Sequence, residues 1–190
     1  DLPLSRGLGD VYKRQGGGVV GVSSLYHLAK KGWSEVILLE RKELTSGSTW
    51  HAAGLLPLFN MSYSVGQVHK YSVKFYQELQ AETGMDVGFR NVSNIRLASK
   101  PDRMDEYRQY AGVARTIGVD VQILTPNEVK HYWPMCNTDG LIGAIRHPSD
   151  GYIQPADLTQ ALARGARDRG AEIYRNTTVT AISQTTEGEW

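Results

Sequence analysis

The sequence predicts an α/β fold whose first clear elements are a helix and a buried strand. Three observations lead to this prediction: a helical pattern over residues 19–31, the apolar run EVILLE over residues 35–40, and further strand and helix patterns that alternate along the chain. Such alternation is typical of α/β and α+β proteins. The run EVILLE suits a strand that is buried on both faces, as in a parallel sheet.

Each predicted helix has an apolar face or a recognisable start or stop. In residues 19–31, Val22, Leu25, Tyr26 and Ala29 share one face, and Gly32 ends the helix. The other predicted helices cover residues 63–83, 101–117 and 155–169, and a short one starts near Pro126. Further strands are predicted over residues 94–99, 121–124, 141–146, 171–174 and 179–183.

Composition excludes several classes of protein. The 190 residues are 41% hydrophobic, which suffices for one core or for a core and part of a second. With 21 Lys and Arg against 20 Asp and Glu, no basic surface indicates nucleic acid or an anionic membrane. Cys136 is the only cysteine, so an intrachain disulfide and a cysteine-based zinc site are excluded. No apolar run approaches the ~20 residues of a membrane-spanning helix.

Three glycines, Gly16, Gly18 and Gly21, form the pattern G-x-G-x-x-G at the start of the first predicted helix. Glycine there permits a tight turn, close approach of a pyrophosphate and close helix packing, and the helix N-terminus attracts the anion. Glu40 ends the next strand about 20 residues on, where a carboxylate can bind ribose hydroxyls. The pattern predicts a dinucleotide site; the alternative is a glycine-rich turn before an ordinary helix.

The residues before Gly16 do not fit this motif. A buried strand should precede the glycine turn, but residues 10–15 read DVYKRQ and contain no apolar run long enough for a central strand. We therefore interpret residues 1–15 as non-native, adapter-like sequence. The last residues, EGEW, resemble a turn that leads into a new strand, so the chain is expected to be a fragment at both ends.

A second motif, GSTWHAAGL at residues 47–55, places Trp50 and His51 among small residues. Small residues allow a large group to approach the backbone closely. Ser48 and Thr49 offer hydroxyl groups, Trp50 offers a flat surface, and a neutral imidazole is a competent nucleophile. The alternative for His51 is a histidine satisfied by a local hydrogen bond. The spacings of the other histidines fit no metal site, and His147 is expected to lie in a loop.

Three stretches together carry a family resemblance: residues 16–32, residues 35–55 and the run SDGYIQPADLTQALARGARDRGAEIY at residues 149–174. They resemble the N-terminal part of dimethylglycine and sarcosine dehydrogenases, which are DAO-type, glycine-oxidase-like FAD-dependent amine oxidoreductases. The resemblance implies a truncated two-domain fold. A Rossmann-like FAD-binding domain would comprise residues 16–60 and 150–190, and residues 61–149 would begin an α+β substrate domain.

The resemblance also implies the cofactor chemistry. In the family, the histidine of the T-W-H motif, here His51, is joined covalently through a ring nitrogen to the 8α carbon of the flavin. The backbone of Val179 would contact the adenine portion. The implied FAD contacts are Gly16, Gly18, Val19, Val20, Gly21, Glu40, Arg41, Gly47, Ser48, Thr49, Trp50, His51, Ala52, Ala53, Gly54, Leu55 and Val179.

A small N-methyl amino acid, dimethylglycine or sarcosine, is the implied substrate, with hydride transfer from its N-methyl carbon to the flavin. The implied electron acceptor is a carrier flavoprotein or oxygen, and relatives often have a tetrahydrofolate-binding C-terminal region. The location would be cytoplasmic in a bacterium and the mitochondrial matrix in a eukaryote. The resemblance assigns no catalytic residue in this chain, because such groups lie largely downstream in this family.

Two alternatives use the same motifs differently. A regulatory subunit of pyruvate dehydrogenase phosphatase has this architecture without being an oxidoreductase, but it lacks the T-W-H motif. A nicotinamide-dependent Rossmann dehydrogenase would explain the glycine turn and Glu40, but it would not explain GSTWHAAGL. Both alternatives are therefore weaker than a flavin enzyme.

Overall fold

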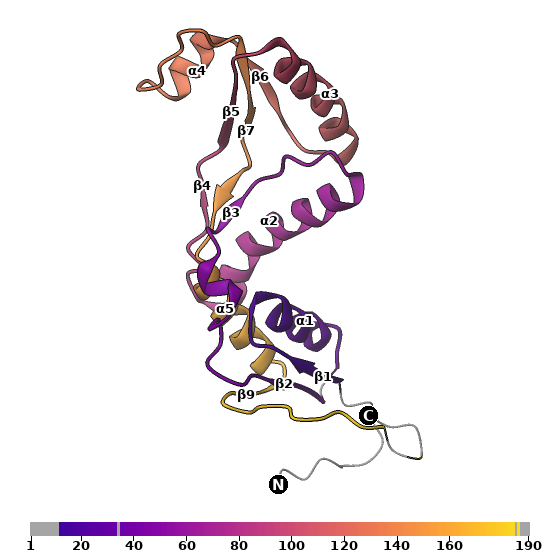
Figure 1. Ribbon diagram of the computed structural model, residues 1–190. Helices are drawn as coiled ribbons and strands as arrows, with labels where there is room; N and C mark the ends of the chain where they lie inside the picture. Colours follow the sequence, from indigo (N-terminus) through magenta and orange to yellow (C-terminus); the bar gives the residue numbers. More distant parts are fainter. Residues whose placement is uncertain (1–11, 34, 185, 187–190) are drawn as a thin grey trace. The chain divides into compact units, whose positions relative to one another are not determined.

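The computed structural model describes residues 12–33, 35–184 and 186 (Figure 1). The chain divides into two compact units. Unit 1 comprises Asp1–Ala53, Leu79–Val87 and Gln154–Trp190, and unit 2 comprises Gly54–Glu78 and Gly88–Ile153. Residues 54–60 and 150–153, assigned from the sequence to the cofactor-binding part, thus belong to unit 2.

Unit 1 is built on a parallel sheet with the strand order β1-β2-β9. Its elements are β1 (Tyr12–Gln15), α1 (Val19–Lys30), β2 (Val36–Leu39), the 3-10 helix η1 (Ser48–His51), α5 (Pro155–Arg167) and β9 (Glu172–Tyr174). Helices α1 and α5 pack against each other beside this sheet (Figure 1). Helix α1 packs on β2, whose Val36 and Leu38 are buried, and α5 packs on α1 and β9, so the expected helix faces and the EVILLE strand contribute to the core of unit 1.

Strand β1 is a correction to the sequence analysis, which predicts no strand before Gly16. The backbone of residues 12–15 pairs in parallel with β2, from Tyr12 opposite Val36 to Gln15 opposite Leu39. Backbone hydrogen bonds of a ladder do not depend on the side chains, and β1 lies at an edge of the described sheet, where it needs only one neighbour. Residues 1–11 of the segment interpreted as non-native lie outside the described residues.

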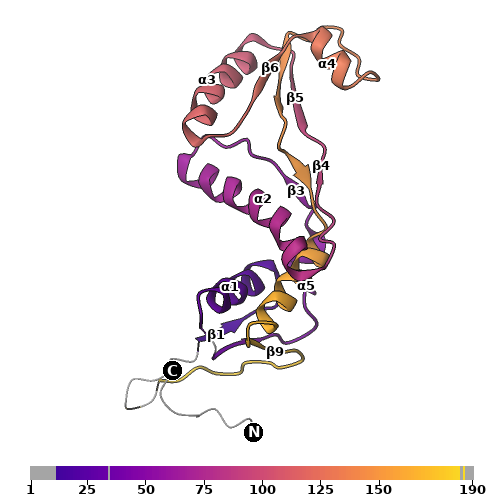
Figure 2. The ribbon, with the colours of Figure 1, turned by 180° about the vertical axis from the view of Figure 1, so that it is seen from behind.

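Unit 2 contains two antiparallel three-stranded sheets together with helices. The strands are β3 (Leu55–Leu56), β4 (Arg90–Asn91), β5 (Asn94–Ala98), β6 (Gln122–Leu124), β7 (Gly143–His147) and β8 (Gly151–Tyr152). The helices are α2 (Tyr63–Thr83), whose residues from Leu79 onward belong to unit 1, α3 (Pro101–Ile117) and α4 (Pro126–Tyr132). Opposite views show α3 alongside the sheet β5-β7-β6 and α4 at its end (Figures 1 and 2). The core between α3 and this sheet includes Tyr107, Tyr110 and Ile145.

Most predicted elements agree with the structure to within a few residues, including all five helices. The strand predicted over residues 179–183 is wrong, because residues 177–184 have no regular structure. Strand β9 ends the described sheet, and the backbone that follows it bonds to the loop after β2 instead: the amide of Asn176 donates to the carbonyl of Lys42 at 3.2 Å. The two-residue strands β3, β4 and β8 are too short to show an alternating pattern.

None of the helices within the described residues is both long and apolar enough to cross a membrane.

Candidate cofactor site

The glycine turn in unit 1 has a geometry that side chains would disrupt. Gly16 has a φ of +97°, a conformation that favours glycine, and its amide donates to the carbonyl of Leu39 at 3.0 Å. A Cβ atom on Gly17 would lie 2.6 Å from Cδ2 of Leu44, and one on Gly18 would lie 3.0 Å from Oγ1 of Thr49. Leu44 and Thr49 therefore pack closely against the glycine turn.

The N-terminus of α1 is arranged to receive an anion. Gly18 is the N-cap residue, it provides no side-chain hydrogen bond, and the first turn of α1 contains no acidic residue. The first four amides of a helix lack partners within the helix, and they carry the positive end of its dipole. The hydroxyl of Thr49 accepts from the amide of Val19 at 2.9 Å, which ties the GSTWHAAGL motif directly to this turn.

Glu40 organises the same turn from the end of β2. Its carboxylate is buried, Oε2 accepts from the amide of Gly17 at 2.5 Å, and Oε1 accepts from the amide of Lys42 at 2.7 Å. The amide of Thr45 also donates to the carbonyl of Gly17 at 2.9 Å. Each carboxylate oxygen has a second lone-pair direction, so Glu40 can hold the turn and still accept a ligand hydroxyl.

Helix η1 displays the second motif as a single 3-10 turn that starts after Gly47. Thr49 is buried and anchors the turn, whereas Trp50 is 70% exposed and His51, Ala52 and Ala53 are exposed. In the part of the chain that the structure describes, the His51 ring makes no hydrogen bond. The alternative of a histidine satisfied by a local hydrogen bond is therefore not what the structure shows.

The other residues that the sequence predicts to contact FAD are divided between the two units. In unit 1, Gly21 is buried in α1, Val20 is 67% exposed, and Arg41 and Ser48 are exposed. Val179 is half-buried in an irregular segment whose Thr177 amide donates to the carbonyl of Glu40 at 2.9 Å, so this segment returns to the end of β2. Gly54 and Leu55 belong to unit 2.

The residues present fit an FAD cofactor. The N-terminus of α1, where the N-cap residue Gly18 provides no side-chain bond and Thr49 accepts from the Val19 amide, suits a pyrophosphate, and Glu40 suits a ribose. The side chains of Leu44 and Thr49 leave little room for a Cβ atom on Gly17 or Gly18. Small and exposed residues around His51 leave the imidazole accessible to a planar group. Among the described residues, no group of three or more His, Cys, Asp or Glu side chains could hold a metal ion.

Unit 2 contains two buried ionisable residues that were not predicted from the sequence. His147, expected in a loop, ends β7 and is fully buried, with its ring centroid 5.4 Å from that of Tyr110 and 5.9 Å from that of Phe59. Burial, and secondarily the charge of Arg96, lower the pKa of His147 to about 4. Burial raises the pKa of Asp150 to about 6. The alternation of GAIRH, which puts His147 on the face of Ile145, is the signal that could have located this histidine.

Comparisons with known proteins agree with this geometry. The profile of a family described as "FAD dependent oxidoreductase" (DAO) matches residues 16–190. The chain belongs to this family. It is 41% identical to the mitochondrial dimethylglycine dehydrogenase of Rattus norvegicus over 175 residues, which are 92% of this chain and 20% of the relative. It is 40% identical to the mitochondrial sarcosine dehydrogenase of Homo sapiens over 168 residues, 88% of this chain and 18% of the relative.

The fold of this DAO-family chain is also found among solved structures. Glycine oxidase from Geobacillus kaustophilus superposes with a TM-score of 0.75 and 31% sequence identity, covering 94% of this chain and 52% of that one. The Rossmann-like, two-domain fold class that the family resemblance implies is thereby confirmed. The chain spans about a fifth of the length of the dehydrogenases that it matches.

Proposed function

We propose that this chain is the FAD-binding part of an enzyme that oxidatively demethylates an N-methyl amino acid, with the flavin attached covalently to His51. The observation that carries the proposal is the bond from the Val19 amide to Thr49, because it fixes the His51 turn beside the glycine turn of a DAO-family protein. The names of the relatives, dimethylglycine and sarcosine dehydrogenase, support the substrate class.

In this proposal each part of unit 1 has one task toward the cofactor. The amides at the start of α1 bind the pyrophosphate, and Glu40 binds the ribose hydroxyls while it holds Gly17. The backbone of Val179 contacts the adenine portion, next to the segment that bonds to Glu40. His51 forms the covalent bond through a ring nitrogen, and Trp50 provides a flat wall beside it. Residues 16–60 and 150–190 are the proposed FAD-binding domain, and residues 61–149 belong to the proposed substrate domain.

The flavin, when bound, supplies the redox chemistry by accepting a hydride from the N-methyl carbon. The nitrogen lone pair then forms a double bond to that carbon, and water releases formaldehyde and the demethylated amino acid. A carrier flavoprotein or oxygen would be the electron acceptor. A tetrahydrofolate-binding region elsewhere in the full-length protein would capture the one-carbon unit.

The covalent bond can be tested by acid precipitation of the full-length protein. We expect the flavin to remain with the precipitated protein, and we expect His51→Ala to release it into the supernatant while noncovalent binding largely survives. The physical reason is that the turn, Glu40 and the α1 N-terminus still hold the dinucleotide half without the imidazole.

His131→Ala is the matched control, since this exposed histidine lies in unit 2 and outside the motif. Flavin that washes free of the unmutated protein would remove the attachment from the proposal. A protein that binds no flavin at all would favour the regulatory, non-catalytic alternative. Assays of the full-length protein with dimethylglycine and with sarcosine, with and without oxygen, would identify the substrate and the acceptor.

A further inference from the structure

The segment that follows β9 is bonded to the residues that follow β2. We call residues 175–179 the β9 extension. The amide of Thr177 donates to the carbonyl of Glu40 at 2.9 Å, and the amide of Asn176 donates to the carbonyl of Lys42 at 3.2 Å. All of these residues belong to unit 1. The backbone of the β9 extension is therefore held at the end of the strand that carries the proposed ribose-binding carboxylate.

The loop that follows β2, residues 41–46, is itself held against the glycine turn. The side chain of Leu44 is buried, and the amide of Thr45 donates to the carbonyl of Gly17 at 2.9 Å. Glu43 directly precedes these two anchored residues. The loop therefore gives Glu43 a fixed backbone position in unit 1.

The carboxylate of Glu43 bonds to two successive residues of the β9 extension. Oε2 accepts from Nη1 of Arg175 at 2.6 Å, and Oε1 accepts from Nδ2 of Asn176 at 3.2 Å. The two bonds join positions 132 and 133 residues apart in the chain. One side chain with a fixed backbone thus restrains two neighbouring residues of the extension.

Asn176 lies where the β9 extension changes direction. Its φ of +55° is in the left-handed region, which residues other than glycine seldom adopt and which asparagine tolerates better than most. The next amide, that of Thr177, returns to the carbonyl of Glu40. The bond from the Asn176 side chain to Glu43 therefore stabilises the conformation that brings the extension back to the end of β2.

Stability alone explains the Glu43 contacts poorly. The side chains of Glu43 and Arg175 are 58% and 54% exposed, and ion pairs between exposed side chains contribute little to the free energy of unfolding. Such a pair can still select one conformation of an irregular segment, because that segment has few buried contacts of its own. The contacts are therefore better explained by the placement of the β9 extension.

We propose that Glu43 is a positioning residue for the adenine end of FAD, because its carboxylate holds the β9 extension where the backbone of Val179 contacts the base; this role rests on the FAD site proposed above. A backbone unit offers one N–H donor and one C=O acceptor. Adenine presents an amino donor beside a ring-nitrogen acceptor, and hypoxanthine presents the opposite pair. A well-placed backbone unit therefore distinguishes the two bases.

The test compares ADP with inosine diphosphate, which differ only in the base. Their dissociation constants are measured by titration calorimetry on the full-length protein that carries His51→Ala and has been freed of flavin. In this background, Glu43→Ala removes both contacts and Glu43→Gln keeps the shape of the side chain without its charge. Asn176→Gly keeps the left-handed turn without the bond to Glu43.

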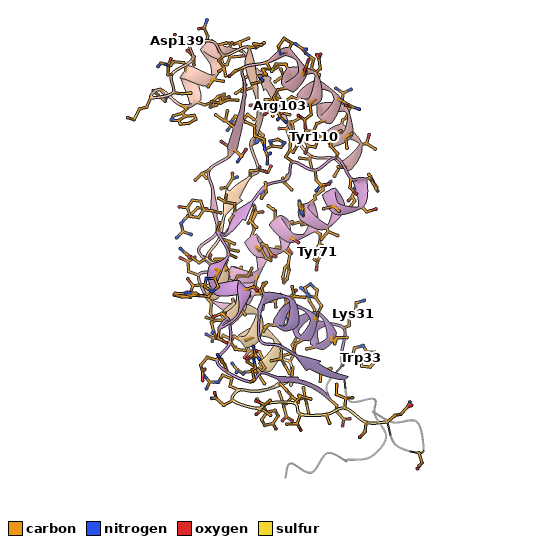
Figure 3. All side chains as sticks on the ribbon, in the orientation of Figure 1. Lys31, Trp33, Tyr71, Arg103, Tyr110 and Asp139 are labelled. Atoms are coloured by element: carbon orange, nitrogen blue, oxygen red, sulfur yellow. The ribbon has the colours of Figure 1, made fainter. Side chains whose placement is uncertain are left out.

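Two control variants remove an exposed carboxylate elsewhere. Asp168→Ala is the matched control, because Asp168 belongs to another exposed ion pair of unit 1, with Nε of Arg164 3.9 Å from Oδ2. Asp139→Ala removes an exposed acid of unit 2, labelled in Figure 3. Both controls should bind ADP and inosine diphosphate as the His51→Ala protein does.

We expect the His51→Ala protein to bind ADP about tenfold more tightly than inosine diphosphate, because hydrogen bonds to the base are lost with the second ligand. Glu43→Ala should reduce this preference to about twofold or less, mainly by weakening ADP, and Glu43→Gln and Asn176→Gly should lie between. The ratio isolates the base, since both ligands share the ribose and the diphosphate.

A general structural role of Glu43 would weaken both nucleotides equally, and that result would overturn the proposal. An unchanged preference in Glu43→Ala would do the same, and so would equal binding of the two nucleotides by the His51→Ala protein. If the His51→Ala protein binds neither FAD nor ADP, the proposed FAD site fails and the positioning role fails with it. Normal binding of FAD and ADP with the same preference in every variant would remove the positioning role alone.

Discussion

Glu40 is the residue on which the proposed dinucleotide site depends most. Its carboxylate accepts from the amides of Gly17 and Lys42, so it shapes the turn before any ligand is bound. Replacing it by alanine removes the proposed acceptor for the ribose hydroxyls and leaves two amides without their partner. Losing hydrogen bonds to a charged group costs about 1.5–3 kcal/mol each. We expect Glu40→Ala to weaken FAD binding by one or more decades.

A covalent bond would hide this loss, so the affinity is measured by equilibrium titration in the His51→Ala background. Glu35→Ala is the matched control, because Glu35 is an exposed carboxylate at the other end of the same apolar run. Equal FAD affinity with and without the Glu40 carboxylate would show that this residue is structural only.

The sequence predicted the position of some site residues, but it did not predict the contacts of others. The spacing of Gly16, Gly18, Gly21 and Glu40 predicted that Glu40 lies at the glycine turn, because the helix and the strand between these positions have typical lengths. The bond from the Val19 amide to Thr49 and the bonds from Arg175 and Asn176 to Glu43 join positions 30, 132 and 133 residues apart. No local pattern encodes such contacts, so only the folded chain reveals them.

At the level of elements, the junction between η1 and α1 couples the two cofactor motifs. Thr49 accepts from the first amide of α1 and thereby acts as a cap supplied from a distant segment. Loss of a helix N-cap typically costs about 0.5–2 kcal/mol. We expect Thr49→Val, which keeps the size but removes the acceptor, to lower the free energy of unfolding by about 1 kcal/mol and to reduce the acid-stable flavin.

Ser48→Ala is the control for this junction, since Ser48 is exposed on the same turn. Urea unfolding followed by circular dichroism reports the stability, and absorbance after acid precipitation reports the flavin. If Thr49→Val and Ser48→Ala behave alike in both measurements, the junction does not place His51.

The helices and strands were easier to predict from the sequence than the pairing of one strand with another. Helices α1, α2 and α3 have long apolar patterns and clear glycine stops, and the sequence located each of them. Strand β1 lacks any apolar pattern, and the predicted strand at 179–183 has no described neighbour to pair with. A strand exists only through a partner, which a single stretch of sequence does not specify.

For the molecule as a whole, His147 and Asp150 predict an unusual dependence of stability on pH. The pKa of His147 is lowered from 6.5 to about 4, so the stability it contributes is lost as the pH falls from about 6.5 to 4. The pKa of Asp150 is raised from 3.8 to about 6, so its contribution is present near pH 4 and lost as the pH rises to about 6. The two residues therefore change the stability in opposite directions between about pH 4 and pH 6.5.

Single substitutions in the full-length protein should reveal how His147 and Asp150 each contribute to the pH dependence of the free energy of unfolding. We compare the free energy of unfolding of each variant with that of the unmutated protein at the same pH. As the pH is lowered from 6.5 to 4, we expect this difference to fall by about 2–3 kcal/mol for Asp150→Asn and to rise by a similar amount for His147→Leu. The double variant should again be flat relative to the unmutated protein. Urea titrations at a series of pH values measure these differences, and parallel curves for all four proteins would contradict the opposed pair.

The sheet of unit 1 joins strands made at very different times. Strand β2 pairs with β9, Ile37 opposite Glu172 and Leu39 opposite Tyr174, and the residues of unit 2 lie between them in the chain. Tyr174 is synthesised 123 residues after His51 (174 − 51 = 123). At about 5–20 residues per second, that interval is on the order of ten seconds. Throughout it, the nascent chain carries both cofactor motifs without the strand that completes their sheet. We therefore expect the capture of FAD to be a late event in biosynthesis, timed by translation of the intervening segment.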